Sequence, residues 1–430
     1  MKIAIFGLGY VGTVSAGCLA ARGHQLIGVD PDEGKVRAVR DGRSPILEPG
    51  LSELLSQAVR EGTLSATSDW ERAVADSEMA WICVGTPSRE NGDVDLRFVR
   101  GVCEQIAIGA KNHTRPYLVV LRSTVPPGTT RSVVTPILEE NYGNTLGGNL
   151  DVCFHPEFLR EGHGVEDFEN PSRIVIGTDQ RGVATTLSNL YTGFNAAVTR
   201  TDLETAELVK YCDNTWHALK VAFANEMGTV AESTGVDPGR LMEIFRDDRK
   251  LNISDAYLRP GFAFGGSCLP KDVRALRHFG RRQDLTLPLL ESLLPSNDEH
   301  IDRALRRIVL EGRRRVGMLG LSFKASTDDL RESPLVELSE RLIGKGFELR
   351  IFDQDVRLAA LIGTNRDYVD RRLPHIAKML VSSIEELVTE SEILVVGHVR
   401  PEDRARLVRL AGDRPILDIG RVLARGPSPD

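Results

Sequence analysis

The chain has 430 residues, enough for about three domains, and its 41% hydrophobic and 27% charged residues are typical of a globular protein. The net charge of −7 and the absence of a dense basic stretch disfavour a nucleic-acid-binding protein, and no apolar run approaches the ~20 residues that cross a membrane. The N-terminus lacks the layout of a secretion signal, and the six cysteines lie far apart without a Cys-x-x-Cys pair. We therefore expect a cytoplasmic protein without a disulfide framework or a metal site.

Residues 1–30 predict a dinucleotide-binding unit. An apolar strand over 2–6 leads into a glycine-rich turn over 7–12, an Ala-rich helix follows, and a second strand over 25–29 ends at Asp30. A strand, a G-x-G-x-x-G turn, a helix and a strand that ends in an acid form the full context of the dinucleotide fingerprint, which a bare glycine motif lacks.

Each glycine of this turn has its own function in such a unit. Gly7 makes the tight turn, Gly9 lets a pyrophosphate approach the backbone, and Gly12 lets the helix pack against the strand. The phosphates then lie at the N-terminus of the helix. The carboxylate of Asp30 can accept hydrogen bonds from ribose hydroxyls and repels a 2′-phosphate, so the sequence favours NAD over NADP as the cofactor.

A second unit of this kind recurs in degraded form near the C-terminus. Its elements are expected at residues 316–323, 335–344, 346–353, 393–396 and 415–418. Near-continuous apolar strands that alternate with helices are typical of parallel sheets buried on both faces. We therefore predict an α/β fold with two doubly wound parallel-sheet (Rossmann-like) domains joined by a long central helix. The C-terminal unit lacks the third glycine, so we expect it to bind something other than a dinucleotide.

A long helix is expected between the two units. Residues 201–204 read Thr-Asp-Leu-Glu, a capping-box pattern, and the helical pattern continues to Gly235. Apolar residues cover much of its circumference, more than one domain can bury, so we infer that the helix also packs on a second subunit. A row of polar residues shares one face and suits either a cleft or a solvated surface. The row consists of Lys210, Asn214, His217 and Asn225.

The stretch 260–272 carries the most informative cysteine. Gly265 and Gly266 let the backbone turn sharply or approach a ligand, and Pro270 suits the first turn of a helix. Cys268 is then expected just before a helix N-terminus, where the helix dipole stabilises a thiolate. The alternative is a small residue that merely fits a tight turn. The other cysteines lie in apolar or helical contexts and are interpreted as packing residues.

A reactive thiolate beside bound NAD has a specific use. Oxidation of an alcohol to an aldehyde needs a base and an orienting group, but no nucleophile. Oxidation of the aldehyde to an acid requires that a nucleophile first adds to the carbonyl carbon. A cysteine does this by forming a thiohemiacetal, which is oxidised to a thioester that water hydrolyses.

Ordered blocks along nearly the whole chain resemble the nucleotide-sugar 6-dehydrogenases, the UDP-glucose/GDP-mannose dehydrogenase family. The blocks are FGLGYVG (6–12), SPILEPG (44–50), VGTP (84–87), RSTV (122–125), PEFLRE (156–161), FGGSCLPKD (264–272), GLSFK (320–324) and DLRESP (329–334). The resemblance implies that C6 of a sugar nucleotide is oxidised from alcohol to carboxylate with two NAD in succession. With the repeat, it implies an NAD-binding domain (1–200), a central helical dimerisation region that carries the catalytic cysteine (201–300) and a sugar-nucleotide-binding domain (301–430).

The resemblance also implies roles for individual residues. Cys268 is the implied nucleophile, and Lys210 and Asn214 are implied to hold the C6 oxygen, where an ammonium stabilises an alkoxide and then an oxyanion. The residues implied to position water and assist proton transfer are Glu157, Thr124 and Asp272. The implied NAD contacts are Gly7, Gly9, Tyr10, Val11, Gly12, Asp30, Lys35, Thr86, Thr124, Lys271 and Arg331. The implied substrate contacts are Glu161, Lys210, Asn214, His217, Asn225, Tyr257, Arg259, Phe262, Gly265 and Lys324.

The segment 257–262 resembles the loop that reaches the sugar nucleotide across the dimer interface, where Arg259 would pair with the phosphates. His217 and Leu269 resemble the GDP-mannose branch of the family, since the UDP-sugar branch usually has an apolar residue and Phe at these positions. His217 can donate to the axial hydroxyl that distinguishes mannose from glucose, or it can be a histidine packed on the helix. Residues 255–256 depart from that branch, which tends to have bulkier side chains before Tyr257.

Three hypotheses follow for the function. The first is oxidation of GDP-mannose to GDP-mannuronate, for which the family implies an exopolysaccharide such as alginate as the destination. The second is the same chemistry on a UDP-hexose, such as UDP-glucose or UDP-N-acetylmannosamine. The third is a non-catalytic module that senses NAD and nucleotide sugars, which the presence of Cys268, Lys210, Asn214 and Glu157 disfavours. We expect a homodimer or larger homo-oligomer.

Overall fold

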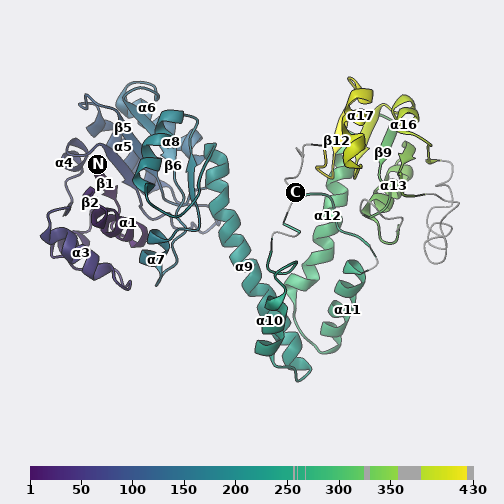
Figure 1. Ribbon diagram of the computed structural model, residues 1–430, viewed down its shortest axis with the longest axis horizontal. Coiled ribbons are helices and arrows are strands. Elements are labelled where there is room, and N and C mark those ends of the chain that lie inside the picture. The colour runs from purple at the N-terminus through teal and green to yellow at the C-terminus, as the bar shows by residue number, and fades with distance from the viewer. Residues whose placement is uncertain (255–256, 259, 267, 324–329, 357–378, 424–430) are drawn as a thin grey trace. The chain divides into compact units, whose positions relative to one another are not determined.

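The computed structural model describes residues 1–430 except 255–256, 259, 267, 324–329, 357–378 and 424–430 (Figure 1). It divides into two compact units, Met1–Ala218 and Leu219–Asp430, each with its own sheet. The expected α/β fold class, with two Rossmann-like sheets and a long helix, is confirmed, while the division into three parts stays a prediction. No helix in the described part of the chain is long and apolar enough to span a bilayer.

The first unit is built on an eight-stranded sheet in the order β3-β2-β1-β4-β5-β6-β7-β8. Its strands are β1 (Lys2–Phe6), β2 (Gln25–Val29), β3 (Leu64–Thr67), β4 (Met79–Ile82), β5 (Tyr117–Leu121), β6 (Leu150–Phe154), β7 (Ile174–Gly177) and β8 (Val198–Thr201). Neighbouring strands are parallel except β6 and β7, which pair antiparallel. The strand order reverses between β1 and β4, and open α/β sheets bind ligands at the carboxyl ends of their strands at such a point.

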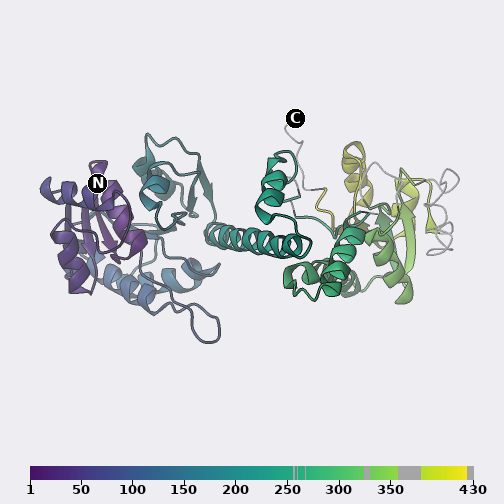
Figure 2. The same ribbon diagram turned by 90° about the horizontal axis from the view of Figure 1, so that it is seen from below.

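Helices cover both faces of this sheet (Figure 1 and Figure 2). They are α1 (Tyr10–Ala21), α2 (Glu33–Arg40), α3 (Leu51–Arg60), α4 (Trp70–Ala75), α5 (Arg97–Ala110), α6 (Thr135–Tyr142), α7 (Gly164–Glu169) and α8 (Arg181–Ser188), with a π-helical turn at Thr130–Val134 and a 3-10 turn at Asn189–Tyr191. Along β1, Ile3 and Ile5 pack in one hydrophobic cluster, whereas Ala4 and Phe6 pack in another. Because alternate side chains of a strand point to opposite faces, both faces of the sheet are buried.

The helix α9 (Leu203–Ser233) has 31 residues, and the division between the two units falls within it. Its N-terminus differs from the expected capping box. The N–H of Thr205 donates to Oδ1 of Asp202 at 2.7 Å, so Asp202 rather than Thr201 caps the helix. Glu204, the expected partner in the box, instead forms an ion pair with Arg131 at 2.5 Å. The carboxylate of Asp202, one residue after Thr201, caps the helix instead, because Asp is at least as good an N-cap as Thr.

The second unit is built on a four-stranded parallel sheet in the order β10-β9-β11-β12. Its strands are β9 (Arg315–Leu319), β10 (Glu348–Phe352), β11 (Ile393–Val396) and β12 (Ile416–Asp418). Its described helices are α10 (Pro238–Asp247), α11 (Leu269–Arg282), α12 (Pro288–Leu310), α13 (Pro334–Gly344), α16 (Ile384–Glu390) and α17 (Pro401–Ala411). The strand order repeats β2-β1-β4-β5 of the first unit, so the repeat that the sequence predicted is present.

Candidate active site

The glycine-rich turn after β1 has the geometry of a phosphate cradle. Gly7 has a φ of +99°, and a Cβ there would lie 2.8 Å from the carbonyl oxygen of Cys83. A Cβ on Gly12 would lie 1.9 Å from the carbonyl oxygen of Gly7, so α1 packs directly on the turn. A Cβ on Gly9, in contrast, would meet nothing within 4 Å. The turn therefore has the tight bend, the close packing and the open face that a pyrophosphate requires.

The groups around this turn fit NAD. The helix α1 begins at Tyr10, its N-cap residue Gly9 supplies no side-chain cap, and the N–H groups of a first helical turn can bind phosphate. The carboxylate of Asp30, at the end of β2, is buried and accepts the N–H of Leu8 at 2.8 Å. Nζ of Lys35 lies 3.2 Å from the same carboxylate oxygen. The turn and α1 would hold the phosphates, and Asp30 would hold the ribose.

Sequence reasoning missed Glu48, which ties this turn to a second loop. The hydroxyl of Tyr10 lies 2.6 Å from Oε2 of Glu48 and 2.7 Å from the carbonyl oxygen of Arg160. The same carboxylate oxygen accepts the N–H of Gly162 at 2.9 Å. Burial alone would raise the pKa of Glu48, but the hydrogen bonds from Tyr10 and the backbone lower it below its ordinary value. Its position as the one acid in the block SPILEPG was the available signal.

A buried ion pair joins α9 to the segment after β6. Nζ of Lys210 lies 2.7 Å from Oε1 of Glu157, and the two side chains are only 10% and 11% exposed. The other carboxylate oxygen accepts the N–H of Leu159 at 2.7 Å, which fixes its direction. Asn214 follows one helical turn later and is exposed. An ammonium that can stabilise a negative oxygen thus lies beside a carboxylate that can accept a proton.

A pocket of about 530 Å³ in the first unit is lined by α9 and by the segments after β6 and before β7. Trp216 and His217 line it from α9, and the buried Arg122 lines it from the end of β5. Nε and Nη1 of Arg122 have no hydrogen-bond partner among the described residues. Burial lowers the pKa of the neighbouring His155 well below its ordinary value, so this imidazole is neutral at pH 7. Because His217 lines this pocket, a polar group of a bound ligand can reach its ring.

In the second unit, Cys268 occupies the N-cap position of α11, and Pro270 lies in the first turn, as the sequence predicted. The Cys268 side chain is exposed. Gly266, two residues earlier, has a φ of +87°, a conformation that glycine adopts without strain. Nζ of Lys271 lies 3.2 Å from Oδ1 of Asp272, so these two exposed charges pair with each other.

The remaining cysteines differ from Cys268 in their surroundings. Burial raises the pKa of the Cys18, Cys83 and Cys103 thiols to about 12, and Cys153 is buried as well. These four are packing residues, as predicted. Cys212 on α9 is exposed, so the packing interpretation is wrong for it.

A second pocket, of about 800 Å³, lies between α12 and the loop that precedes Cys268. Tyr257 and Phe262 line it on the loop side, and Tyr257 has a φ of +63° and is 85% exposed. Arg303 and Arg307 line it from α12 and Arg421 from the segment after β12. Aromatic rings and guanidinium groups in one pocket suit a nucleotide, whose base stacks and whose phosphates are negative.

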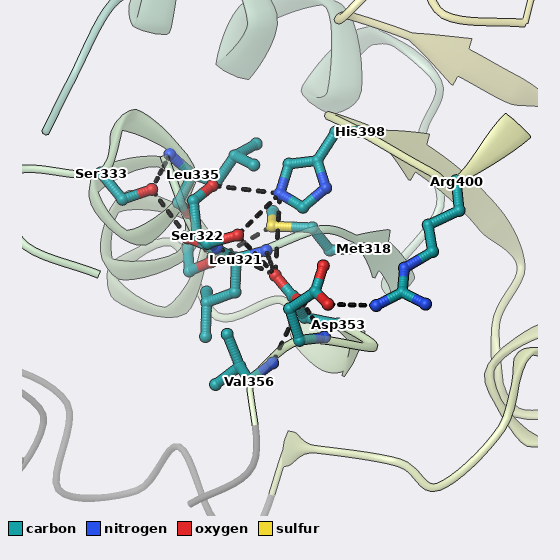
Figure 3. Close-up of polar contacts among 11 residues, drawn as sticks. Met318, Leu321, Ser322, Ser333, Leu335, Asp353, Val356, His398 and Arg400 are labelled. Atoms are coloured by element: carbon teal, nitrogen blue, oxygen red, sulfur yellow. Dashed lines mark hydrogen bonds and ion pairs between the residues drawn. The ribbon is translucent and has the colours of Figure 1, made fainter. Parts of the chain in front are cut away.

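The turn after β9 resembles the first dinucleotide turn in its bend but not in its open face. Figure 3 shows the groups around it, among them Asp353 and the ring of His398. Gly320 has a φ of +90°, and Oδ2 of Asp353 accepts the N–H groups of Leu321 at 2.7 Å and Ser322 at 3.0 Å. A Cβ on Gly320 would lie 2.8 Å from the ring of His398, so the imidazole covers this turn. The helix α13 begins only at residue 334. This geometry supports the expectation that the second unit does not hold a dinucleotide.

The predicted site residues are distributed over both units. Those in the first unit are Gly7, Gly9, Tyr10, Val11, Gly12, Asp30, Lys35, Thr86, Thr124, Glu157, Glu161, Lys210, Asn214 and His217. Those in the second unit are Asn225, Tyr257, Phe262, Gly265, Cys268, Lys271, Asp272 and Arg331. Arg259 and Lys324 lie outside the described residues. The structure joins Lys210 to Glu157, and it joins Thr86 to Thr124 through a hydrogen bond of 2.8 Å from the Thr86 hydroxyl to the Thr124 carbonyl oxygen.

Models of the UDP-glucose/GDP-mannose dehydrogenase family match the chain in three stretches, the NAD binding domain at 1–195, the central domain at 204–299 and the UDP binding domain at 317–424. A GDP-mannose 6-dehydrogenase of Pseudomonas aeruginosa is 49% identical over 398 residues, which cover 93% of this chain and 91% of that protein. A UDP-glucose 6-dehydrogenase of Haloferax volcanii is 35% identical over 362 residues, which cover 82% and 83%. The crystal structure of a ternary complex of the Pseudomonas aeruginosa GDP-mannose dehydrogenase superposes with a TM-score of 0.96 at 46% identity, covering 100% of this chain and 98% of that one.

Proposed function

The chain belongs to the UDP-glucose/GDP-mannose dehydrogenase family, and from this premise we propose that it oxidises C6 of GDP-mannose to the carboxylate of GDP-mannuronate. Two parts of the prediction are already established by the family match, namely that the chain is an NAD-dependent nucleotide-sugar dehydrogenase and that its N-terminal part is the NAD-binding domain. The choice of sugar nucleotide and the roles of individual residues are the proposal.

The buried pair of Lys210 and Glu157 is the observation that supports this function most strongly. Taking two charges out of water is costly, and here they are held in hydrogen-bonding contact at 2.7 Å. The arrangement suits a reaction in which the C6 oxygen carries a negative charge twice, as an alkoxide in the first oxidation and as an oxyanion in the second. Glu157 can accept the proton that the hydroxyl group loses. In the first oxidation, Lys210 stabilises the alkoxide while Glu157 accepts the hydroxyl proton. NAD, when bound, accepts a hydride from C6 in each of the two oxidations.

In the second oxidation, the thiolate of Cys268 adds to the aldehyde carbon. A C–S bond forms, and the carbonyl oxygen becomes an oxyanion that Lys210 and Asn214 stabilise. Loss of a hydride from C6 restores the C–O double bond as a thioester. Glu157 first passes the proton of the first oxidation to solvent. Water, positioned by Glu157 and Thr124, then adds to C6 and gives a proton to the Glu157 carboxylate, the C–S bond breaks, and the thiolate leaves. The exposed position of Cys268 at a helix N-terminus supports this role.

GDP-mannose is the favoured sugar nucleotide for two reasons. The GDP-mannose 6-dehydrogenase of Pseudomonas aeruginosa is 49% identical to the chain, whereas the UDP-glucose enzyme of Haloferax volcanii is 35% identical. His217 lines a pocket of the first unit, where its ring can donate to the axial hydroxyl of mannose.

A substrate panel tests the proposal. The purified protein is supplied with NAD and with GDP-mannose, UDP-glucose or UDP-N-acetylmannosamine, and NADH is followed by its absorbance. We expect turnover with GDP-mannose alone and two NADH for each sugar consumed. Turnover of UDP-glucose without GDP-mannose would contradict the specificity, and binding of NAD and sugar nucleotide without any turnover would instead support a sensor.

We also propose that a second copy of the chain covers part of α9. Leu208, Trp216, Leu219 and Val221 are large apolar residues of this helix with exposed fractions of 40% to 61%. Several such side chains on one helix are typical of an interface between subunits. A mass measurement in solution should give a dimer or a multiple of it, and a monomer at micromolar concentration would contradict this.

A further inference from the structure

The backbone that leads to Cys268 is held by a side chain from another element. Asn297 on α12 accepts the N–H of Phe264 with Oδ1 at 2.8 Å and donates from Nδ2 to the Phe264 carbonyl oxygen at 2.9 Å. Among described residues, these two are the hydrogen bonds of the backbone from 260 to 266. The side-chain amide of Asn297 therefore binds both backbone groups of Phe264, which lies four positions before Cys268.

The next two residues of the turn are fixed by close packing. A Cβ on Gly265 would lie 2.3 Å from the carbonyl oxygen of Glu332 and 2.6 Å from Cδ of Pro334. A Cβ on Gly266, whose φ is +87°, would lie 3.0 Å from the ring of Phe323. The turn thus packs on Phe323 and on the segment 332–334, and the hydrogen bonds to Phe264 set how the chain enters it.

These two hydrogen bonds require an amide at position 297, with one acceptor and one donor. Oδ1 must face the N–H of Phe264 and Nδ2 must face its carbonyl, so the opposite orientation would lose both bonds. An aspartate at this position could accept the N–H, but its second oxygen would face the carbonyl oxygen. An alanine would leave both backbone groups without this partner, and each such loss weakens the hold on the turn.

We propose that Asn297 is a positioning residue that sets the sulfur of Cys268 for addition to the aldehyde carbon. This inference rests on the proposed function, in which Cys268 is the nucleophile. The first oxidation does not use the thiol, so a displaced turn should leave it largely intact. Thioester formation requires the sulfur within bonding reach of C6, and a small displacement of a reacting group slows such a step by about 10- to 100-fold.

The test uses Asn297→Ala and Asn297→Asp in the full-length protein, with Ser292→Ala as the matched control. Ser292 is on the same helix, and its hydroxyl donates to the Leu289 carbonyl oxygen rather than to the turn. The measurements for each variant are the NADH formed per GDP-mannose consumed, the aldehyde trapped by a hydrazine reagent, and the alkylation rate of Cys268 in a Cys212→Ser background. The KM for GDP-mannose and the melting temperature are measured as well.

For both Asn297 variants we expect NADH per sugar to fall from two towards one, trapped aldehyde to appear, and alkylation of Cys268 to slow by about 10-fold or more. The control should match the parent protein. A purely structural role would lower the melting temperature without changing the NADH ratio, and this result would overturn the proposal. A rise in KM for GDP-mannose alone would also overturn it, because Asn297 would then act on the adjacent pocket.

Cys268→Ser separates failure of this inference from failure of the proposed function. If Cys268→Ser still forms GDP-mannuronate at the parent rate, the thioester mechanism itself is wrong. If Cys268→Ser forms no acid while both Asn297 variants behave like the control, the mechanism holds and the positioning role is wrong. Should Asn297→Ala fail to fold, Asn297→Asp, which can keep the bond to the Phe264 N–H, gives the answer.

Discussion

The turn after β1 and the turn after β9 begin alike and end differently. Both start with a glycine of positive φ, +99° at Gly7 and +90° at Gly320, and both face an acid at the end of the neighbouring strand, Asp30 or Asp353. In the first unit, a helix follows at once and the second glycine faces open space. In the second, the ring of His398 covers the turn.

This difference indicates which features of the first unit serve dinucleotide binding. The strand order, the bend and the acid are shared, so they do not distinguish the two turns. What distinguishes the first unit is the N-terminus of a helix directly behind an uncovered backbone, which offers N–H groups to a phosphate. Substitutions in both turns test whether this difference decides cofactor binding.

The largest effect is expected at Gly12. A Cβ 1.9 Å from the Gly7 carbonyl oxygen forces α1 away from the turn, so Gly12→Ala should abolish NAD binding and cost about 1–3 kcal/mol of stability. Gly9→Ala is the control, since its Cβ meets nothing within 4 Å. It should keep the fold and weaken NAD binding through contact with the pyrophosphate alone. Thermal unfolding and NAD titration separate the two, and equal melting temperatures would contradict the packing argument.

The next effect concerns Asp30 and Asp353, the acids at corresponding positions of the two turns. Asp30→Asn removes the charge that repels a 2′-phosphate, so the affinity for NADP relative to NAD should rise by about 10-fold. Asp353→Asn should leave that ratio unchanged and cost about 2 kcal/mol, because the carboxylate of Asp353 accepts several backbone N–H groups. Fluorescence titration with both cofactors and denaturant unfolding measure these effects. A shifted ratio in Asp353→Asn would mean that the second turn takes part in cofactor binding.

A smaller effect is expected at Gly320, in the turn that the ring of His398 covers. Gly320→Ala adds a Cβ that would lie 2.8 Å from the His398 ring, at a φ that disfavours a side chain, and should cost about 2 kcal/mol. His398→Ala should remove the clash but not the backbone strain, so the double variant should recover about half of the loss. Denaturant unfolding of all four proteins gives the coupling. His398→Ala alone should not create a second NAD site, which equilibrium dialysis checks.

The smallest effect concerns Glu48. Its pKa is lowered in the folded protein, so its charge contributes stability above the unfolded pKa, and this contribution is lost as the pH falls through the folded pKa. Glu48→Gln should therefore lower the stability near neutral pH and flatten the decline that begins near the unfolded glutamate pKa of about 4.3 and continues as the pH falls further. Unfolding midpoints across this range measure the effect. A parallel shift of the whole profile would mean that shape rather than charge matters at this position.

The repeating parts of the fold were predictable from sequence because their signals are local. The strands at 2–6, 25–29 and 393–396 were placed at their observed bounds. The expected strand at 316–323 ends at Leu319, since Gly320 bends the chain there. Asp202 rather than the expected Thr201 caps α9, because both residues are of types that make good N-caps.

The contacts of the site were predictable only in part. Tyr10 and the glycines belong to one motif, so their placement followed from spacing. Glu48 and Asn297 were missed as functional candidates because their partners lie far along the chain, at Gly162 and at Phe264. His398 was missed for the same reason, since it covers a glycine of another strand. No local pattern distinguishes Asn297 and His398 from ordinary polar residues, whereas Glu48 at least lies in the block SPILEPG.

The proposed covalent role of Cys268 is tested most directly by peptide mass analysis of enzyme quenched with acid during turnover of GDP-mannose. We predict that the peptide with Cys268 carries a GDP-mannuronyl group. When the C6 aldehyde replaces GDP-mannose as the substrate, Glu157→Gln, which disturbs the water that attacks the thioester, should increase the fraction of this peptide that is modified. The peptide with Cys212 should remain unmodified. Formation of GDP-mannuronate without any adduct on Cys268, in the parent protein and in Glu157→Gln, would contradict the proposed covalent role.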